Sequence, residues 1–139
     1  DTVGVNDLYL RISRQNLPIR FSMDYADRHR KELSSITNLE ELETFFAQNP
    51  LRQDFVAYLR KQGINPVLPQ WNECSDILIT QIKAYIGRNT RLEDKGFYPY
   101  LGKIDNVVQK ALKILYAPLV TELPESGLVL APIGNDFDK

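Results

Sequence analysis

Residues 71–89 read WNECSDILITQIKAYIGRN, and this stretch decides the fold class. Its apolar residues recur at helical spacing over about five turns. They are Trp71, Cys74, Leu78, Ile82, Tyr85 and Ile86. Because this spacing places them along one side of a helix, we expect the longest and most central helix of the chain here.

The chain before this helix predicts four shorter ones, near residues 6–15, 18–33, 38–48 and 50–62. Pro18 and Pro50 suit first helical turns, and Gly63 suits a helix end. Thr37 and Glu40 match the pattern in which a Thr oxygen caps a helix and a Glu three residues later reaches back to a free amide. The second helix is expected to bury a stripe of Ile19, Met23, Ala26 and Leu33, broadened by Phe21 and Tyr25.

The prolines at 66 and 69 predict an extended connector over residues 64–69. Gly96, Pro99 and Gly102 predict an ordered loop over 90–102, with room for one helical turn. Asp105 is expected to cap a last helix over 105–117, with an inward stripe of Val107, Val108, Ala111, Leu112 and Leu115. We therefore predict an all-α domain of five or six packed amphipathic helices over 1–117, followed by a flexible or extended tail over 118–139.

The composition indicates one water-soluble globular domain. The chain has 139 residues, with 17 Lys and Arg against 18 Asp and Glu. This balance argues against a dedicated nucleic-acid domain, which is usually strongly basic. The sequence also has no run of 18 apolar residues, so no membrane insertion is expected. Residue 1 is Asp rather than Met, and we expect the chain to be a processed or excised part of a longer protein.

The ionisable residues do not predict a metal site. The chain has one His and one Cys, far apart in sequence. Asp24 and Asp27 can share a helix face, but His29 points elsewhere. A solvated helix face is the preferred interpretation of these three residues.

The sequence likewise predicts no catalytic or cofactor-binding residues. Ser75 and Lys83 would be about 12 Å apart along a helix axis, too far for proton transfer. No Ser lies in a G-x-S-x-G context, and no glycine-rich phosphate loop is present. The aromatic residues Phe97, Tyr98 and Tyr100 leave two alternatives open, a plug in the core or an exposed platform for a peptide.

Several stretches resemble the carboxyl-terminal processing (tail-specific) serine peptidases of bacterial cell envelopes, in the segment after their protease core. They are residues 1–5, Phe21 with 24–27 and Arg30, 83–89, 96–98, and Asp105 with 107–111. Residues 83–89 resemble a helix end that usually carries Ala where this chain has Gly87. The resemblance covers roughly residues 1–117.

The resemblance implies that the Ser nucleophile and Lys base belong to a core outside this chain. It implies a periplasmic or cell-envelope location, and partners in the peptidase core, its polypeptide substrates or further copies of the domain. Arg30, Arg88 and Asp105 would form either internal ion pairs or docking contacts. The expected function is that of a non-catalytic accessory domain. The alternative is a free-standing helical module that binds a peptide or protein, with Phe97 and Tyr98 in its groove.

Overall fold

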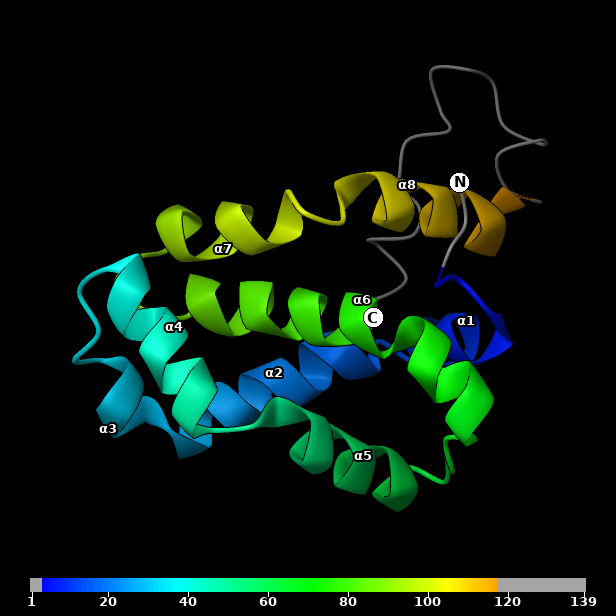
Figure 1. Cartoon of the computed structure of the whole chain (residues 1–139), viewed down its shortest axis with the longest axis horizontal. Helices are drawn as coiled ribbons and strands as arrows, with labels where there is room; N and C mark the ends of the chain where they lie inside the picture. The colour runs from blue at the N-terminus through cyan, green and yellow to red at the C-terminus, as the bar shows by residue number, and fades with distance from the viewer. Residues whose placement is uncertain (1–3, 118–139) are drawn as a thin grey trace, which may run out of the picture.

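The computed structural model describes residues 4–117, and all regular secondary structure within that range is helical (Figure 1). This confirms the predicted all-α class. The range contains eight helices: α1 (Asp7–Arg14), α2 (Leu17–Arg28), α3 (Arg30–Leu33), α4 (Leu39–Gln48), α5 (Leu51–Lys61), α6 (Leu68–Arg88), α7 (Asp94–Leu101) and α8 (Asp105–Leu115). The tail predicted over 118–139 lies outside the described residues.

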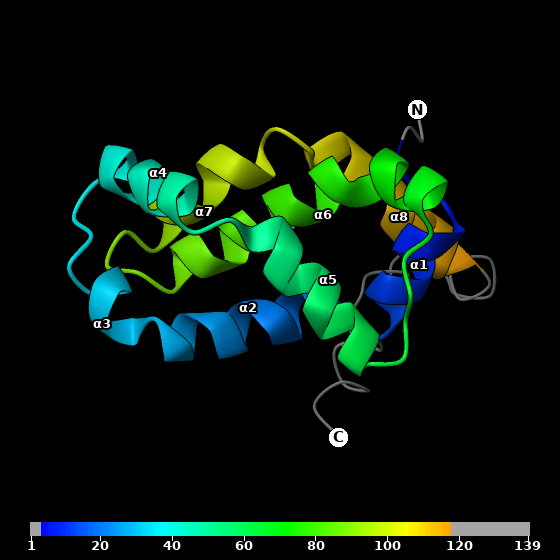
Figure 2. The ribbon, with the colours of Figure 1, turned by 60° about the horizontal axis from the view of Figure 1, so that its bottom comes forward.

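The long helix α6 lies at the centre of the fold, as its sequence predicts. It runs between α2 on one side and α7 on the other, and both views show this order (Figures 1 and 2). Helix α1 packs near the start of α6, and α8 lies close to α1. Because helices pack on both sides of α6, it buries residues all around its axis, including Trp71, Leu78, Ile79 and Ile82.

An aromatic cluster fills the space between α2, α5 and α6. The ring of Phe21 lies 5.1 Å from that of Phe55 and 5.4 Å from that of Tyr58, centroid to centroid. Trp71 extends the cluster from α6, at 6.3 Å from Phe55. Burying a large apolar side chain contributes about 1.5–3 kcal/mol, so this cluster anchors α5 to the rest of the domain.

The predicted helix over 18–33 is interrupted at His29. The backbone there departs from helical geometry, with φ −108° and ψ 22°. The carbonyl oxygen of Tyr25 accepts the backbone N–H of His29 and also lies 3.0 Å from the ring Nδ1 of His29. A side chain that competes for backbone groups in this way favours a helix end.

The buried face of α2 also differs from the predicted stripe. Phe21, Tyr25 and Ala26 are buried, but Ile19 and Met23 are 45% and 46% exposed. The buried face of α2 is therefore turned relative to the predicted one. Aromatic packing explains this, because the ring of Phe21 contacts those of Phe55 and Tyr25 inside the domain. The prediction was right for Ala26 and Leu33, and for Phe21 and Tyr25, but wrong for Ile19 and Met23.

The start of α4 has the predicted kind of cap, shifted by one residue. Asn38, rather than Thr37, accepts a hydrogen bond from the N–H of Glu41 at 2.8 Å. The carboxylate of Glu41, rather than Glu40, accepts the N–H of Thr37 at 2.8 Å. Asn and Thr both cap helices, and sequence alone did not decide between two adjacent candidates.

The proline-rich connector is shorter than predicted, because α6 already begins at Leu68 and Pro69 lies in its first turn. The missing N–H of a proline costs little there. The predicted loop over 90–102 was also wrong, since α7 occupies most of it. Pro99 lies inside α7, but buried Gly96, Phe97 and Tyr100 hold that helix against the domain.

Asp105 does not cap the last helix. Ile104 occupies that position without a side-chain hydrogen bond, and Asp105 is the first residue of α8. Its carboxylate still suits the positive end of the helix dipole. Of the predicted stripe only Ala111 is buried, and Val107, Val108, Leu112 and Leu115 are half-buried.

Candidate functional site

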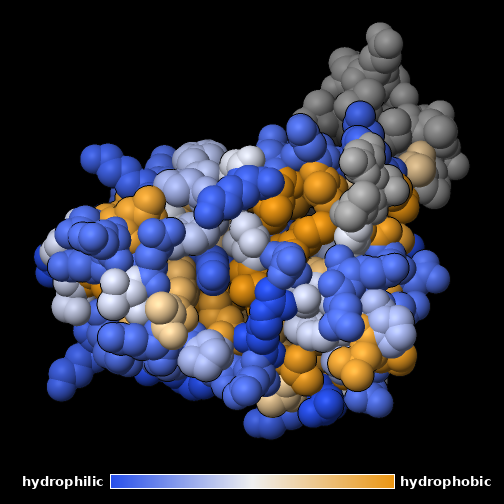
Figure 3. All heavy atoms as spheres, viewed as in Figure 1, coloured by the Kyte–Doolittle hydropathy of each residue, from blue (hydrophilic) through white to orange (hydrophobic). Residues whose placement is uncertain are grey.

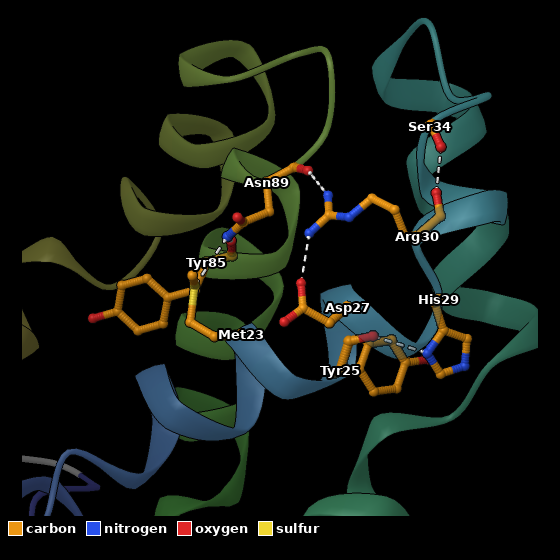
Figure 4. Close-up of polar contacts among 8 residues, drawn as sticks. All are labelled: Met23, Tyr25, Asp27, His29, Arg30, Ser34, Tyr85 and Asn89. Atoms are coloured by element: carbon orange, nitrogen blue, oxygen red, sulfur yellow. Dashed lines mark hydrogen bonds and ion pairs between the residues drawn. The ribbon is translucent and has the colours of Figure 1, made fainter.

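Arg30 connects the start of α3 to the end of α6. Its guanidinium donates to the carbonyl oxygen of Asn89 at 2.8 Å and pairs with the carboxylate of Asp27 at 3.2 Å (Figure 4). The pair with Asp27 is exposed and is worth about 0–1 kcal/mol. The bond to Asn89 satisfies a carbonyl at the end of α6, where no helical partner remains.

Asn89 extends this contact toward α2. Its side-chain amide donates to the carbonyl oxygen of Tyr85 at 2.9 Å and lies 3.5 Å from the sulfur of Met23 (Figure 4). On the other side of Arg30, the His29 ring stacks on Tyr25 with centroids 4.0 Å apart. These residues join α2, α3 and α6 at one end of the domain.

Gly87 and Gly96 bring the backbones of α6 and α7 into direct contact. A Cβ added to Gly96 would lie 2.5 Å from the carbonyl oxygen of Gly87, and one added to Gly87 would overlap the carbonyl oxygen of Gly96. An Ala at position 87 therefore does not fit this spacing. The two helices lie closer together than that residue permits.

Arg88 holds the start of α7 in place. Its guanidinium pairs with Asp94 at 3.2 Å and lies 4.5 Å from the centre of the Phe97 ring. Phe97 is buried, and its ring lies 6.2 Å from that of Tyr85. We refer to Arg30, Gly87, Arg88, Asn89, Gly96 and Phe97 as the bracing cluster.

A short link, residues 89–93, joins α6 to α7. The hydroxyl of Thr90 donates to the carbonyl oxygen of Gly87 at 2.7 Å and accepts the N–H of Leu92 at 3.1 Å. Glu93 has a positive φ of 51°, which is uncommon for a residue with a side chain. The link turns the chain back within a few residues.

Tyr98 and Asp105 lie outside the bracing cluster. Tyr98 is 56% exposed, unlike its neighbour Phe97. Both Tyr98 and Asp105 line an open hollow of about 940 Å³ between α7 and α8, together with Lys103, Lys110 and Lys113. Asp105 forms no ion pair with any residue that the structure describes.

Apolar surface is also present beside α8. Ile114 on this helix is 42% exposed. Figure 3 shows apolar surface gathered at this end of the molecule, interrupted and bordered by hydrophilic side chains. Exposed apolar side chains gathered in one area can contribute to an interaction surface.

A smaller pocket of about 290 Å³ lies where α4, α6 and α7 meet. It is lined by Glu43, Phe46, Ala47, Thr80, Lys83, Tyr100 and Lys103. The sequence analysis did not identify it as a site. Thr80 and Lys83 share one face of α6, but Tyr100 lies on α7, which the sequence did not predict to be helical.

Three candidate nucleophiles, Ser22, Ser75 and Cys74, are buried. Ser75 is buried in α6, and the hydroxyl of Ser22 donates to the carbonyl oxygen of Pro18 at 2.6 Å. Burial raises the pKa of the Cys74 thiol to about 11, which disfavours the reactive thiolate. Within residues 4–117 no three His, Cys, Asp or Glu side chains come together as metal ligands. None of the helices described is both long and apolar enough to span a bilayer.

Residues 8–90 match the sequence profile of DUF8443, a family of unknown function. This is more than half of the chain, which therefore belongs to that family. The match covers α1 to α6 and ends before α7. No curated protein and no solved structure gives a significant match.

Proposed function

We propose that this chain is a non-catalytic accessory domain of a carboxyl-terminal processing serine peptidase of the bacterial cell envelope, and that it docks to the peptidase core. Proteolysis of envelope polypeptides would then belong to the core. The single observation that supports this most is where the resembling stretches lie in the fold.

Three of these stretches, 24–27 with Arg30, 83–89 and 96–98, are far apart in sequence but meet at the bracing cluster. Arg30 bonds the carbonyl of Asn89, and Arg88 lies over Phe97. Each contact joins different helices. Because three of the resembling stretches contain residues that brace one helix against another, the resemblance supports a shared domain fold with a structural role.

The exposed apolar side chains offer surface for docking. Ile19 and Met23 lie on α2, and Ile114 lies on α8. A peptidase core covering such surface would remove apolar area from water, the main favourable term in protein association. The ion pairs at Arg30 and Arg88 are internal to the domain, which leaves these apolar residues as the better candidates for the contact.

The proposal is tested with the chain and a peptidase core produced separately. We expect the chain alone to show no peptide hydrolysis and to bind the core in calorimetry. Replacing Met23 and Ile19 by Ser should weaken binding, and Val67→Ser on the α5–α6 connector is a matched exposed control. Hydrolysis by the chain alone that a single Ser→Ala substitution abolishes would contradict the proposal, as would a gene with no peptidase core preceding the domain.

The second candidate is a free-standing module that binds a peptide. The hollow of about 940 Å³ beside exposed Tyr98 favours it. Fluorescence anisotropy with peptide libraries would detect such binding. If it exists, Tyr98→Ala should lose it while leaving binding to a peptidase core unchanged.

A further inference from the structure

The pocket between α4, α6 and α7 brings polar groups from three helices to one place. Glu43 comes from α4, Thr80 and Lys83 come from α6, Tyr100 comes from α7, and Lys103 follows α7. Phe46 supplies an apolar wall. A concave apolar site with a few converging polar groups is the usual form of a ligand site.

Tyr100, which lines this pocket, has a buried hydroxyl without a hydrogen-bond partner among the described residues. The residue as a whole is 4% exposed. Most buried polar groups in proteins are hydrogen-bonded, so an unpaired one calls for an explanation. Burial, followed by the nearby charge of Glu43, raises the pKa of Tyr100 to about 12, so the hydroxyl keeps its proton and can donate it to an acceptor.

Two ammonium groups flank the same space. The Nζ of Lys83 lies 5.7 Å from the centre of the Phe46 ring, and that of Lys103 lies 5.6 Å from the centre of the Tyr100 ring. Neither lysine forms an ion pair with a described residue. Burial lowers the pKa of Lys83, and Lys103 and Arg52 lower it further against the opposing charge of Glu43. A bound anion would relieve this repulsion.

The balance of charge selects the kind of anion. Arg52 is already paired with Asp76. Lys83 and Lys103 against Glu43 leave one net positive charge, which matches a monoanion better than a doubly charged phosphate. Glu43 is exposed and lines the pocket, so it can turn toward water when a ligand enters.

We propose that this pocket binds a carboxylate group, with the Tyr100 hydroxyl and the Lys83 ammonium as its donors and Lys103 as a further positive charge. The inference concerns this pocket alone and does not depend on the proposed peptidase context. The carboxylate can come from an acidic side chain or from the end of a polypeptide, and both fit the same donors.

The test is an NMR titration of the whole chain with small probes. N-acetylglutamate amide presents a side-chain carboxylate, N-acetylalanine presents a terminal one, and N-acetylglutamine amide is the neutral control. We expect saturable shifts at the amides of Thr80, Lys83 and Tyr100 with at least one acid, and the stronger of the two identifies the source. Equal binding of the neutral amide, tighter binding of inorganic phosphate, or no saturable shift with either acid would overturn the proposal.

Variants separate binding from folding. Tyr100→Phe removes an oxygen without a partner, so it should leave the melting temperature unchanged or higher while lowering carboxylate affinity by about threefold or more. Lys83→Met should lower affinity by about tenfold, and Glu43→Gln should raise it. Tyr98→Phe is the matched control and should bind as the parent does. Wild-type affinity in Tyr100→Phe contradicts the assignment even if Lys83→Met fails to fold.

Discussion

Helices α7 and α8 follow one another in the chain but are held in different ways. Helix α7 contains a glycine and a proline, yet it buries three residues and lies directly on α6. Helix α8 has the clearer apolar stripe, yet Ala111 is the one residue it buries among those described. An apolar stripe shows that a helix can bury a face. A partner that allows close approach decides whether it does.

The largest effect is expected from breaking the contact that holds α7. In Gly87→Ala the new methyl group would overlap the backbone of Gly96, so α7 must move away from α6. Overpacking of this kind costs about 1–3 kcal/mol, measurable by urea unfolding. Gly102→Ala, just after α7, is the milder comparison, because its new methyl group would lie 3.0 Å from the carbonyl oxygen of Tyr98 and should cost less than the overlap at Gly87. Equal stability of Gly87→Ala and the parent would show that α7 is not held by this contact.

The second prediction concerns α1, the helix that packs against α8. Helix α8 lies near α1, and Tyr9 of α1 donates its hydroxyl to the Oε1 of Gln81 on α6 at 2.8 Å. Tyr9→Phe should cost about 1 kcal/mol at neutral pH. Hydrogen exchange should then increase in α1 and α8 more than in α7. A uniform increase would contradict the distinction between the two helices.

The same residue predicts a pH dependence. Burial raises the pKa of Tyr9 to about 12, above the ordinary value of 10. Between those values the unfolded chain loses a proton that the folded chain keeps, so the stability due to Tyr9 declines as pH rises. The difference in melting temperature between the parent and Tyr9→Phe should therefore narrow above pH 10. A constant difference up to pH 12 would be inconsistent with the raised pKa.

A smaller effect is expected at the start of α7. Arg88→Met removes both the pair with Asp94 and the contact with the Phe97 ring. Because the arginine is half exposed, the loss should be about 0.5–1 kcal/mol. Asp94→Asn removes the ion pair alone and should cost less. If both variants cost the same in urea unfolding, the Phe97 contact contributes nothing measurable.

The smallest effect is expected on α8. Leu112 is half-buried, so Leu112→Ala should cost about 0.5 kcal/mol, well below the 2–5 kcal/mol typical of a fully buried leucine. The buried Leu78 of α6 is the matched comparison. A cost for Leu112→Ala as large as that for Leu78→Ala would mean that α8 is held as firmly as the core.

The sequence predicted those parts of the fold in which local signals agree. Helix α6 has an apolar pattern over its whole length, and Pro50 and Gly63 bracket α5. Helix α7 was missed because Gly96 and Pro99 lower helix propensity. Its stability comes instead from Gly87, on another helix, and no local pattern carries that information.

The candidate sites could not be predicted from local sequence patterns either. The Arg88–Phe97 contact could be anticipated only as two residues of a resemblance, and it is the turn between α6 and α7 that places them together. The pocket proposed to bind a carboxylate is lined by Glu43, Lys83 and Tyr100, which lie on three separate helices. Sequence spacing identifies residues on one helix face, but it does not identify a site assembled from three.

The short link between α6 and α7 has a consequence for the order in which the domain folds. Thr90 and Glu93 reverse the chain within a few residues, so contacts between the two helices join residues that are close in sequence. Such contacts require little loop-closure entropy and tend to form early. We expect the α6–α7 hairpin to belong to the folding transition state. Stopped-flow measurements should then show that Gly87→Ala slows refolding more than it accelerates unfolding.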